Sequence, residues 1–390
     1  MDVLMLVVSN VAHDARVLRE ASALADHGHA VHIVGRDVPE GWQPPDGVTL
    51  ASVSGGSGLK PGGSASPRRR RGPVGVTRAA ARWILLPQHR QRVWRAWCEQ
   101  ARTAVGERRF DVVHAHDFNV LLLAAELADR SGAKLVYDSH EWWSGRERHG
   151  RPTPFERRRE LSDERRIVAR ADAVLTVSDG IAARLGRWRA TPVAVIRNTF
   201  PLISAPDEVA QLPERPRGVV YAGRIGAARD IETLLDAASG LGLETLLMGN
   251  ADREYLPKLR GYTANVRIEP ARPVDEVDTV LRRVGISMVT LTDTCENHRL
   301  ALPNKVFHAV RAGVPVVAAD LPELRRLVTA YGIGALYRPG DAASLRAALE
   351  AVTADYPGLC DRARRARAEL NWDQDAGELV KVYEALAAER

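Results

Sequence analysis

The 390-residue sequence has only three cysteines, Cys98, Cys295 and Cys360, and they lie far apart. Neither a disulfide framework nor a cysteine metal site fits this spacing, so we expect a reducing compartment. Long apolar runs are also missing: none approaches the ~20 residues that span a bilayer, and Val3–Val8 has no basic segment before it. We therefore predict a cytoplasmic protein with neither a signal peptide nor a membrane span.

Several nucleotide-binding and catalytic motifs are absent. The segment Val8–Ala12, which follows the first strand candidate, has no glycine, whereas a dinucleotide-binding domain needs Gly-x-Gly-x-x-Gly there. The sequence has no P-loop and no Gly-x-Ser-x-Gly nucleophile elbow. These absences argue against dehydrogenases, P-loop kinases and α/β hydrolases.

Arginine supplies most of the positive charge. The formal net charge is +6, and arginines cluster at residues 68–71 and 157–159. Such a surface suits an anionic membrane or an anionic small molecule, or is simply a solvated surface. No helix-turn-helix, zinc-finger or RNA-recognition signature accompanies the charge, so we expect no nucleic-acid partner.

Short β-branched runs alternate with segments of helical periodicity, which is typical of parallel strands joined by crossover helices. Between the first two strand candidates, Asp14–His27 has apolar residues on one helical face, and Gly28 supplies the stop. The predicted strands are Val3–Val8, Ala30–Gly35, Val112–His114, Lys134–Asp138, Ala173–Val177 and Val193–Ile196, then Gly218–Ala222, Glu244–Met248, Val266–Ile268, Gly285–Val289 and Pro315–Ala318.

The two series of strands predict two doubly wound domains, at residues 1–198 and 218–370. Residues 199–217 carry four prolines and no periodicity, so we interpret them as the linker. Residues 54–75, rich in Gly, Ser, Pro and Arg, are predicted to be a mobile loop of the first domain. A helix over 371–390 is expected to pack back on the first domain.

The second half carries the strongest candidate for a binding site. Gly223 and Arg224 follow a predicted strand, where ligands of open α/β sheets bind, and Arg229 comes five residues later. Gly223 allows close backbone approach, and two guanidinium groups could surround a diphosphate without a metal. An arginine taken alone more often forms a surface salt bridge, and it is the combination with the Asn-Lys helix start and the domain layout that favours a binding site.

A second group, Asn304 and Lys305, opens a predicted helix after Pro303. Free backbone N–H groups at this helix start would attract an anion, and Lys305 adds a charge. His308 lies four residues after Asn304 on the same face, where its ring could reach a ribose or sugar hydroxyl.

These residues resemble a known family. The second half is similar to the nucleotide-binding domain of the retaining glycosyltransferases of family four, and the first half to a branch of that family. The matching segments are Gly223-Arg224, Arg229 and Gly313–Val317, with Ser9-Asn10, Asp14–Glu20, Asp111–Asp117 and Tyr137–Glu141 in the first half. The resemblance implies a GT-B fold, in which two Rossmann-like parallel-sheet domains face each other across a cleft, and a nucleotide diphosphate sugar as donor.

The sequence departs from the family at its paired glutamates, which would fall at Leu300 and His308. The Pro-Asn-Lys form of the motif occurs in a branch that lacks the first glutamate. The second binds the ribose hydroxyls in the family, and His308 replaces it here. Arg229 stands where lysine is usual, which preserves phosphate contact but changes its geometry.

The first half supplies the remaining candidates. The resemblance favours His116 as a contact of the donor sugar; His114, His116 and Asp117 could also bind a metal, but spacing suggests no fourth ligand, so we predict none. Acceptor-side residues are predicted to be Asn10, Asp14, Arg16, His140 and Glu141, with Asp14 otherwise a helix N-cap. Trp142 and Trp143 would either stack on a sugar or pack in the interior.

Together these observations predict a metal-independent, retaining hexosyltransferase without a cofactor, in which His116, Arg224 and Arg229 are catalytic. The donor would be a nucleotide sugar, with uridine expected from family frequency, and the acceptor a glycan, a lipid-linked molecule or a natural product. Peripheral contact with the inner face of an anionic membrane would suit a lipid-linked acceptor. The alternatives are a nucleotide-sugar epimerase of the same architecture and a non-catalytic sugar-nucleotide-binding protein.

Overall fold

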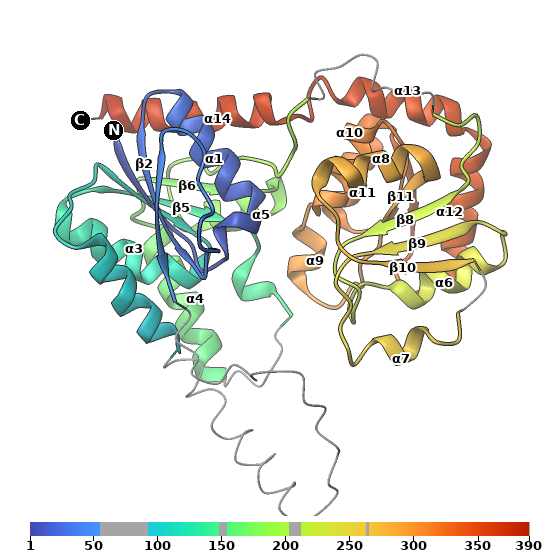
Figure 1. Cartoon of the computed structure of the whole chain (residues 1–390), viewed down its shortest axis with the longest axis horizontal. Coiled ribbons are helices and arrows are strands. Elements are labelled where there is room, and N and C mark those ends of the chain that lie inside the picture. The colour runs from blue at the N-terminus through green and yellow to red at the C-terminus, as the bar shows by residue number, and fades with distance from the viewer. Residues whose placement is uncertain (55–92, 148–153, 203–211, 263–264, 390) are drawn as a thin grey trace, which may run out of the picture. The chain divides into compact units, whose positions relative to one another are not determined.

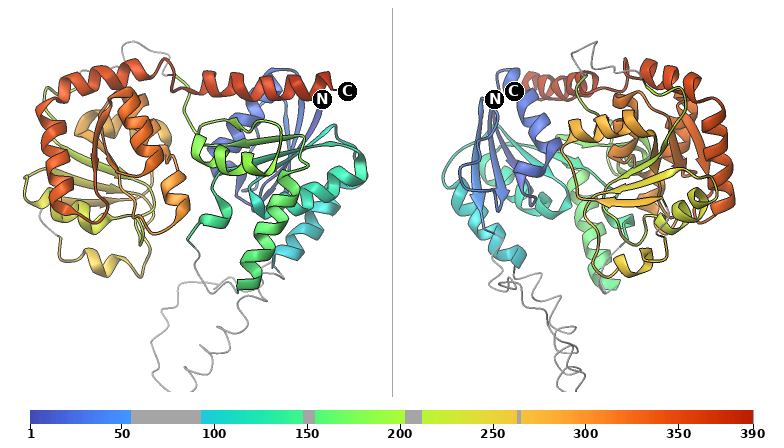
Figure 2. Two further views of the ribbon diagram at one scale, coloured as in Figure 1. Left: turned by 180° about the vertical axis from the view of Figure 1, so that it is seen from behind. Right: turned by 45° about the vertical axis from the view of Figure 1, so that its right-hand side comes forward.

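The computed structural model describes residues 1–54, 93–147, 154–202, 212–262 and 265–389 (Figure 1). Two parallel β-sheets, of seven and six strands, are each flanked by helices (Figures 1 and 2). The chain divides into two compact units: Met1–Asp138 with Arg148–Val174 and Ala385–Arg390, here called the first unit, and Ser139–Glu147 with Leu175–Glu384, the second unit. The predicted α/β class with two Rossmann-like sheets is confirmed.

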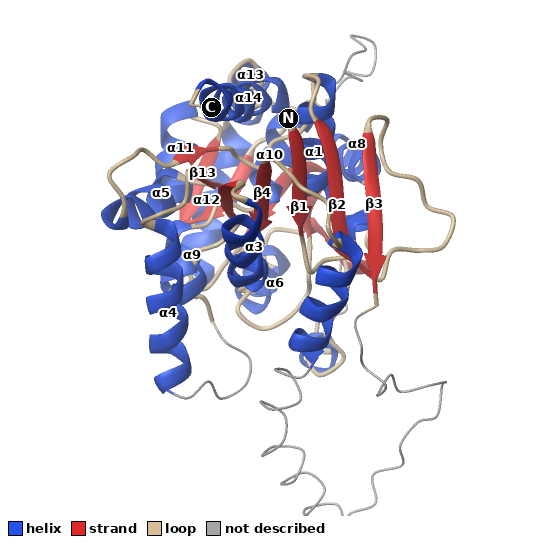
Figure 3. Cartoon of the chain, turned by 90° about the vertical axis from the view of Figure 1, so that its left-hand side faces the viewer, coloured by secondary structure: helices blue, strands red, loops and turns tan. Residues whose placement is uncertain are grey.

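The seven-stranded sheet has the order β3-β2-β1-β4-β5-β6-β7, and Figure 3 shows β1, β2 and β3 side by side. Apolar runs fill its centre, where β1 and β4 are buried over almost their whole length. Its strands are β1 (Asp2–Leu6), β2 (Ala30–Arg36), β3 (Val48–Val53), β4 (Val112–His116), β5 (Lys134–Ser139), β6 (Ala173–Thr176) and β7 (Ala194–Val195).

The helices that accompany this sheet begin and end at local signals. Asp14 caps α1 (Ala15–Asp26) by accepting a hydrogen bond from the Val17 amide, and Gly28 adopts a left-handed φ of 81° after it, as the sequence predicts. The others are α3 (Phe118–Ser131), α4 (Pro154–Val168) and α5 (Asp179–Leu185), with short 3₁₀ turns η1 (Val11–His13), η2 (Trp143–Gly145) and η3 (Gly186–Trp188).

The six-stranded sheet has the order β10-β9-β8-β11-β12-β13. The strand order reverses between β8 and β11, and in open parallel sheets such a reversal opens a ligand crevice outside the carboxyl ends of the strands. Its strands are β8 (Gly218–Ala222), β9 (Glu244–Met248), β10 (Val266–Glu269), β11 (Gly285–Val289), β12 (Val316–Ala319) and β13 (Gly334–Tyr337).

Helices cover this second sheet, with α6 contacting α12 and α8 contacting α10 (Figure 1). Amphipathic faces on these helices seal a single apolar core. The helices of this region are α6 (Ile231–Ser239), α7 (Leu256–Leu259), α8 (Val274–Val284), α9 (Glu296–Leu300), α10 (Asn304–Ala312), α11 (Pro322–Tyr331), α12 (Ala342–Ala354) and α13 (Tyr356–Ala366). The helix α14 (Trp372–Ala388) follows them along the chain.

The three cysteines are free, and their environments differ. Burial raises the pKa of the Cys98 thiol to about 11 and also raises the pKa of Cys360. Cys295 is partly exposed and directly precedes α9. Among the described helices, none is long and apolar enough to cross a bilayer.

Two strands were not predicted from the sequence, and both lie at sheet edges. β3 and β13 are only partly buried and lack the continuous apolar runs of central strands. The predicted loop at 54–75 and the arginines at 68–71 lie outside the described residues, except for Ser54. The domain and linker boundaries stay predictions.

Candidate functional site

Two glycines bring the backbone close together at the carboxyl ends of β8 and β9. Gly223 and Gly249 both have φ of 152°, which side chains rarely adopt. A Cβ on Gly249 would lie 2.0 Å from the Gly223 carbonyl oxygen, and a Cβ on Gly223 would lie 2.8 Å from Lys305 Nζ. The second contact places Lys305, at the start of α10, beside the residue that follows β8.

Arg224 follows Gly223 and forms an ion pair with Asp252. Its Nε lies 2.9 Å from Asp252 Oδ1 and its Nη2 lies 3.0 Å from Oδ2. Arg224 is 54% exposed, so the guanidinium remains open to a ligand from solvent. The predicted cation is therefore present at the strand end, with a carboxylate that the sequence analysis did not identify.

The loop that carries Arg229 has a fixed backbone. Its neighbours Ala228 and Asp230 both have positive φ, which is uncommon outside glycine. Thr290, directly after β11, donates a hydrogen bond to the Arg229 carbonyl at 2.6 Å. The buried Asp230 carboxylate accepts hydrogen bonds from the Tyr337 hydroxyl at 2.8 Å and the Gly340 amide at 3.0 Å.

Lys305 and Arg229 lie close enough to influence each other's charge. Helix α10 begins at Asn304 after Pro303, as predicted, and Asn304 itself is exposed. The Lys305 Nζ lies 4.6 Å from the centre of the Tyr221 ring. Burial and the neighbouring Arg229 lower the pKa of Lys305 to about 7. Among the described residues, no carboxylate pairs with either cation.

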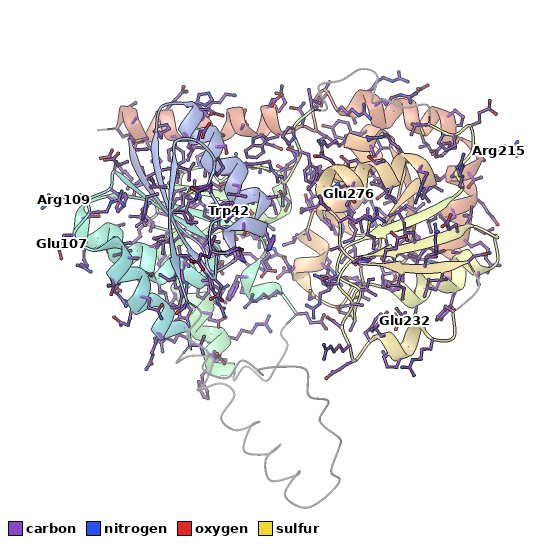
Figure 4. All side chains as sticks on the ribbon, in the orientation of Figure 1. Trp42, Glu107, Arg109, Arg215, Glu232 and Glu276 are labelled. Carbon is purple, nitrogen blue, oxygen red and sulfur yellow. The ribbon has the colours of Figure 1, made fainter. Side chains whose placement is uncertain are left out.

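His308 has a different environment from the one expected of a ribose contact. Its Nδ1 lies 2.8 Å from the Asp278 carboxylate on α8, and its ring packs against Phe200 at 4.3 Å between centres. Arg311 also approaches Asp278, at 2.9 Å. In Figure 4, Glu276 marks the helix that supplies this carboxylate. The ribose role of His308 stays a prediction.

In the first unit, His116 lies in a buried charged cluster made of Arg16, Glu20, His114, His116 and Asp138. Their exposed fractions are at most 3%. The Arg16 guanidinium holds both oxygens of Asp138, at 2.8 and 2.9 Å, and lies 2.9 Å from Glu20. Arg16, which was predicted on the acceptor side, is 3% exposed and lies among these carboxylates, and its acceptor role stays a prediction.

The other acceptor-side candidates of the first unit shape the loop after β1. Asn10 accepts a hydrogen bond from the Ala12 amide at 3.1 Å and donates one to the Asp37 carbonyl at 3.0 Å. Asp14 is the N-cap of α1 and accepts a second hydrogen bond from the Ser9 hydroxyl at 2.6 Å. The N-cap interpretation of Asp14 is confirmed, and neither side chain is fully buried.

The segment after β5 belongs to the second unit. His140 and Glu141 are partly exposed, and Glu141 lies 3.0 Å from Arg146. Trp142 and Trp143 are each 5% exposed, so they pack in the interior and do not offer a sugar-stacking face. The Trp142 indole donates to the Glu296 carboxylate on α9 at 2.9 Å.

Several residues of the site went unrecognised in the sequence. Asp252 pairs with Arg224, and Thr290 donates to the Arg229 carbonyl, from segments that no local pattern connects to these arginines. Glu20 could have been found, because it lies four residues after Arg16 on one helical face, a spacing that allows an ion pair.

Family models match most of the chain. Residues 13–199 match the glycosyl transferase 4-like domain, and residues 216–355 match the glycosyl transferases group 1. The first matched segment includes His116, and the second includes Gly223, Arg224, Arg229 and Lys305.

Curated relatives are found in mycobacteria. A phosphatidyl-myo-inositol mannosyltransferase of Mycobacterium leprae is 28% identical over 200 residues, which cover 49% of this chain and 52% of the relative. The match thus spans about half the length of that protein. A glycogen synthase of Mycobacterium tuberculosis is 26% identical over 302 residues, covering 72% of this chain and 70% of the relative.

Solved structures share the whole fold. Sucrose-phosphate synthase from Thermosynechococcus elongatus superposes with a TM-score of 0.76 at 18% identity, with 100% of both chains covered. Anabaena HepE, solved in complex with UDP-glucose, gives a TM-score of 0.69 at 15% identity, covering 99% of this chain and 100% of the other. At these identities the likeness shows the fold alone, which is that of GT-B glycosyltransferases.

Proposed function

The chain belongs to glycosyltransferase family four, and from this we propose that it transfers a sugar from a nucleotide diphosphate sugar to a hydroxyl acceptor with retention of anomeric configuration. Uridine is the base we propose, since HepE was solved with UDP-glucose. The transferred group is proposed to be a hexosyl unit. The reaction is proposed to need neither a metal nor a cofactor.

The observation that carries this proposal is the pair of uncompensated cations at the strand ends. Burial, and to a smaller extent the neighbouring Arg229, lower the pKa of Lys305 to about 7, and no described carboxylate pairs with either cation. A bound diphosphate would neutralise both, and Gly223 would let its oxygens approach the backbone. The amide groups at Asn304 add the positive end of α10.

In the proposed reaction, the acceptor hydroxyl oxygen forms a bond to the anomeric carbon as the bond from that carbon to the diphosphate breaks. The acceptor proton passes to the departing phosphate oxygen. Arg224, Arg229 and Lys305 stabilise the charge that develops on the diphosphate, the term that usually contributes most to catalysis of this kind. No side-chain nucleophile is required.

The remaining roles are assigned to the amino-terminal residues. We assign the sugar contact to His116 and the acceptor side to Asn10, Asp14, His140 and Glu141. His116 ends β4, Asn10 lies in the loop after β1, and His140 directly follows β5. Ligands of parallel sheets bind at such strand ends.

The acceptor class is proposed from the surface of α4. Phe155 is 79% exposed and Leu161 is 38% exposed, and exposed arginines 157–159 lie between them. Apolar side chains among arginines are typical of a helix that lies on an anionic membrane. We therefore favour a lipid-linked acceptor met at the inner membrane face; the mycobacterial mannosyltransferase is named for a lipid, phosphatidyl-myo-inositol.

The test combines binding with product analysis. Calorimetry should detect binding of UDP or another nucleoside diphosphate to the protein. Incubation with nucleotide sugars should give slow hydrolysis of the donor. Arg224→Ala should lower turnover by ~10²-fold or more, whereas Arg267→Ala, which removes an equally exposed and ion-paired arginine, should not.

The other outcomes of these experiments would contradict the proposal or favour one of the alternative functions. Absence of affinity for every nucleoside diphosphate would disprove the proposal. Isomerisation of the donor would indicate an epimerase, and binding without turnover a non-catalytic sugar-nucleotide-binding protein.

A further inference from the structure

The buried charged cluster of the first unit joins two elements of the sheet to α1. His114 and His116 are two residues apart on β4 and therefore face the same side of the sheet. Arg16 and Glu20 lie on successive turns of α1 on that side. Asp138 is the register partner of His116 on the neighbouring strand β5. The five side chains thus meet because of strand alternation, helix period and strand register.

The contacts link the five side chains in one sequence. His116 Nδ1 lies 3.4 Å from Asp138 Oδ2, Asp138 is held by Arg16, and Arg16 holds Glu20. Glu20 Oε2 lies 3.9 Å from His114 Nε2, and the two imidazole rings stack at 4.3 Å between centres with 17° between their planes. Each histidine therefore has a carboxylate beside one ring nitrogen and the other imidazole beside its face.

A divalent metal is the obvious alternative occupant, since one ligand atom from each of Glu20, His114, His116 and Asp138 falls within 4.8 Å of the others. Charge argues against it. Arg16 already contributes one positive charge against two carboxylates, so the five groups carry a formal charge of −1 with neutral imidazoles. A dication would convert this to +1 in a buried place and would lie beside the Arg16 guanidinium.

We propose that Arg16 and Asp138 are positioning residues for His116: Asp138, fixed by Arg16, keeps a proton on Nδ1 of His116 and sets the orientation of its ring. A carboxylate beside one imidazole nitrogen selects the tautomer in this way. The backbone reinforces the arrangement, because the Asp117 amide donates to the Asp138 carbonyl at 2.8 Å and Asp117 has a left-handed φ of 68°. The link from ring orientation to turnover rests on the proposed function.

The ring itself can be observed without any substrate. Long-range ¹H–¹⁵N spectra of the histidine side chains, assigned by comparison with His116→Gln and His114→Gln, report which nitrogen carries the proton. We expect Nδ1 of His116 to be protonated at pH 7 in the intact protein. A spectrum with Nδ1 unprotonated would overturn the proposal, as would one equivalent of zinc that the purified protein retains and His114→Gln loses.

The variant that tests the role is Asp138→Asn, which keeps the shape of the side chain and removes its charge. We expect a mixed His116 tautomer and a kcat at least ~10-fold lower with little change in the donor KM. Arg16→Lys should retain more activity than Arg16→Met. A merely structural role would instead lower the melting temperature without changing the tautomer, and that result would contradict the proposal.

The matched control is Asp129→Asn. Asp129 and Arg170 form the same two-pronged pair in the first unit, at 2.6 and 2.9 Å, but on the surface. This variant should leave kcat and the His116 spectrum unchanged. If the tautomer follows the expectation and no sugar transfer is found, the positioning proposal stands for the ring and the proposed function alone fails.

Discussion

Arg224 and Asp252 form a two-pronged ion pair at the carboxyl ends of β8 and β9, with nitrogen–oxygen distances of 2.9 and 3.0 Å. The side chains are 54% and 36% exposed, so water screens the pair, and such pairs contribute on the order of 0–1 kcal/mol to stability. Arg224 can therefore exchange its carboxylate for a phosphate at little cost in stability.

Removing that carboxylate should strengthen nucleotide binding. In Asp252→Asn, a diphosphate no longer competes with Asp252 or meets its charge, so we expect the Kd for UDP to fall by ~3- to 10-fold at low salt and by less at high salt. Calorimetry at two ionic strengths measures this. Asp361→Asn, which removes a carboxylate from an exposed pair on α13, is the control. Weaker UDP binding in Asp252→Asn would contradict the prediction.

Lys305 should make nucleotide binding depend on pH. Its pKa of about 7 leaves it mostly neutral at pH 8.5, and a diphosphate would favour the charged form, so binding should take up as much as one proton there. Calorimetry in buffers of different ionisation enthalpy counts this proton. Lys305→Met should abolish the proton uptake, whereas the control Lys258→Met, on α7, should leave it unchanged. Equal binding heats in all buffers for the wild type would contradict the prediction.

The same lysine affects stability in a defined direction. Between pH 7 and the ordinary value of 10.5, the unfolded chain binds this proton and the native protein does not. The contribution of Lys305 to the free energy of unfolding therefore rises with pH across that window.

His32 should contribute to acid sensitivity of the first unit. Its Nδ1 lies 2.8 Å from the Thr49 hydroxyl, and burial together with Arg108 lowers its pKa to about 4. Between pH 6.5 and 4 the unfolded chain is protonated at His32 while the native protein is not, so its contribution to the free energy of unfolding falls as pH falls. Urea titrations across this range should show a smaller pH slope in His32→Asn; an unchanged slope argues against this assignment. His27→Gln serves as the control.

Glycine is required at position 249 by contact as well as by conformation. Gly249→Ala should lower the free energy of unfolding by about 3 kcal/mol or more, because its methyl group would overlap the Gly223 carbonyl. Gly28→Ala also has positive φ but meets nothing within 4 Å, so about 1–2 kcal/mol is expected. Similar losses in the two variants, measured by urea unfolding, would show that the close approach is not what matters.

The exposed face of α4 should bind anionic vesicles. Phosphatidylserine-rich vesicles should sediment the protein at low salt and release it at high salt, because attraction to arginine is screened. Phe155→Ser and Arg158→Glu should each weaken sedimentation several-fold by removing one apolar anchor or reversing one charge. Leu256→Ser and Arg253→Glu, on the second unit, make the same kinds of change; loss of sedimentation in those variants instead would place the contact elsewhere.

Central strands were predictable because burial on both faces leaves an unbroken apolar run. β8, β9 and β11 have the bounds that the sequence predicts. β3 and β13 were missed because an edge strand is half solvated and can carry Thr, Ser or Gly, so its pattern resembles that of a loop.

The positions of the candidate residues were predictable where a charged residue follows a strand or opens a helix, as at Gly223-Arg224 after β8 and Asn304-Lys305 at the start of α10. It was not predictable where the partner comes from a distant segment. Asp138 lies 122 residues from Arg16, and only the register of β4 with β5 brings it to His116. Likewise, only the packing of α8 on α10 gives His308 its carboxylate.

The unequal burial of the three thiols gives this protein a native labelling site. A maleimide dye at neutral pH reacts with an accessible thiolate, and the shielded sulfurs of Cys98 and Cys360 hold their protons too strongly to compete. Cys295 would take the label alone, at the start of a helix whose His298 has its pKa lowered by burial and, to a smaller extent, by Arg229. Fluorescence from that position would report occupancy of the proposed nucleotide site in the unaltered sequence.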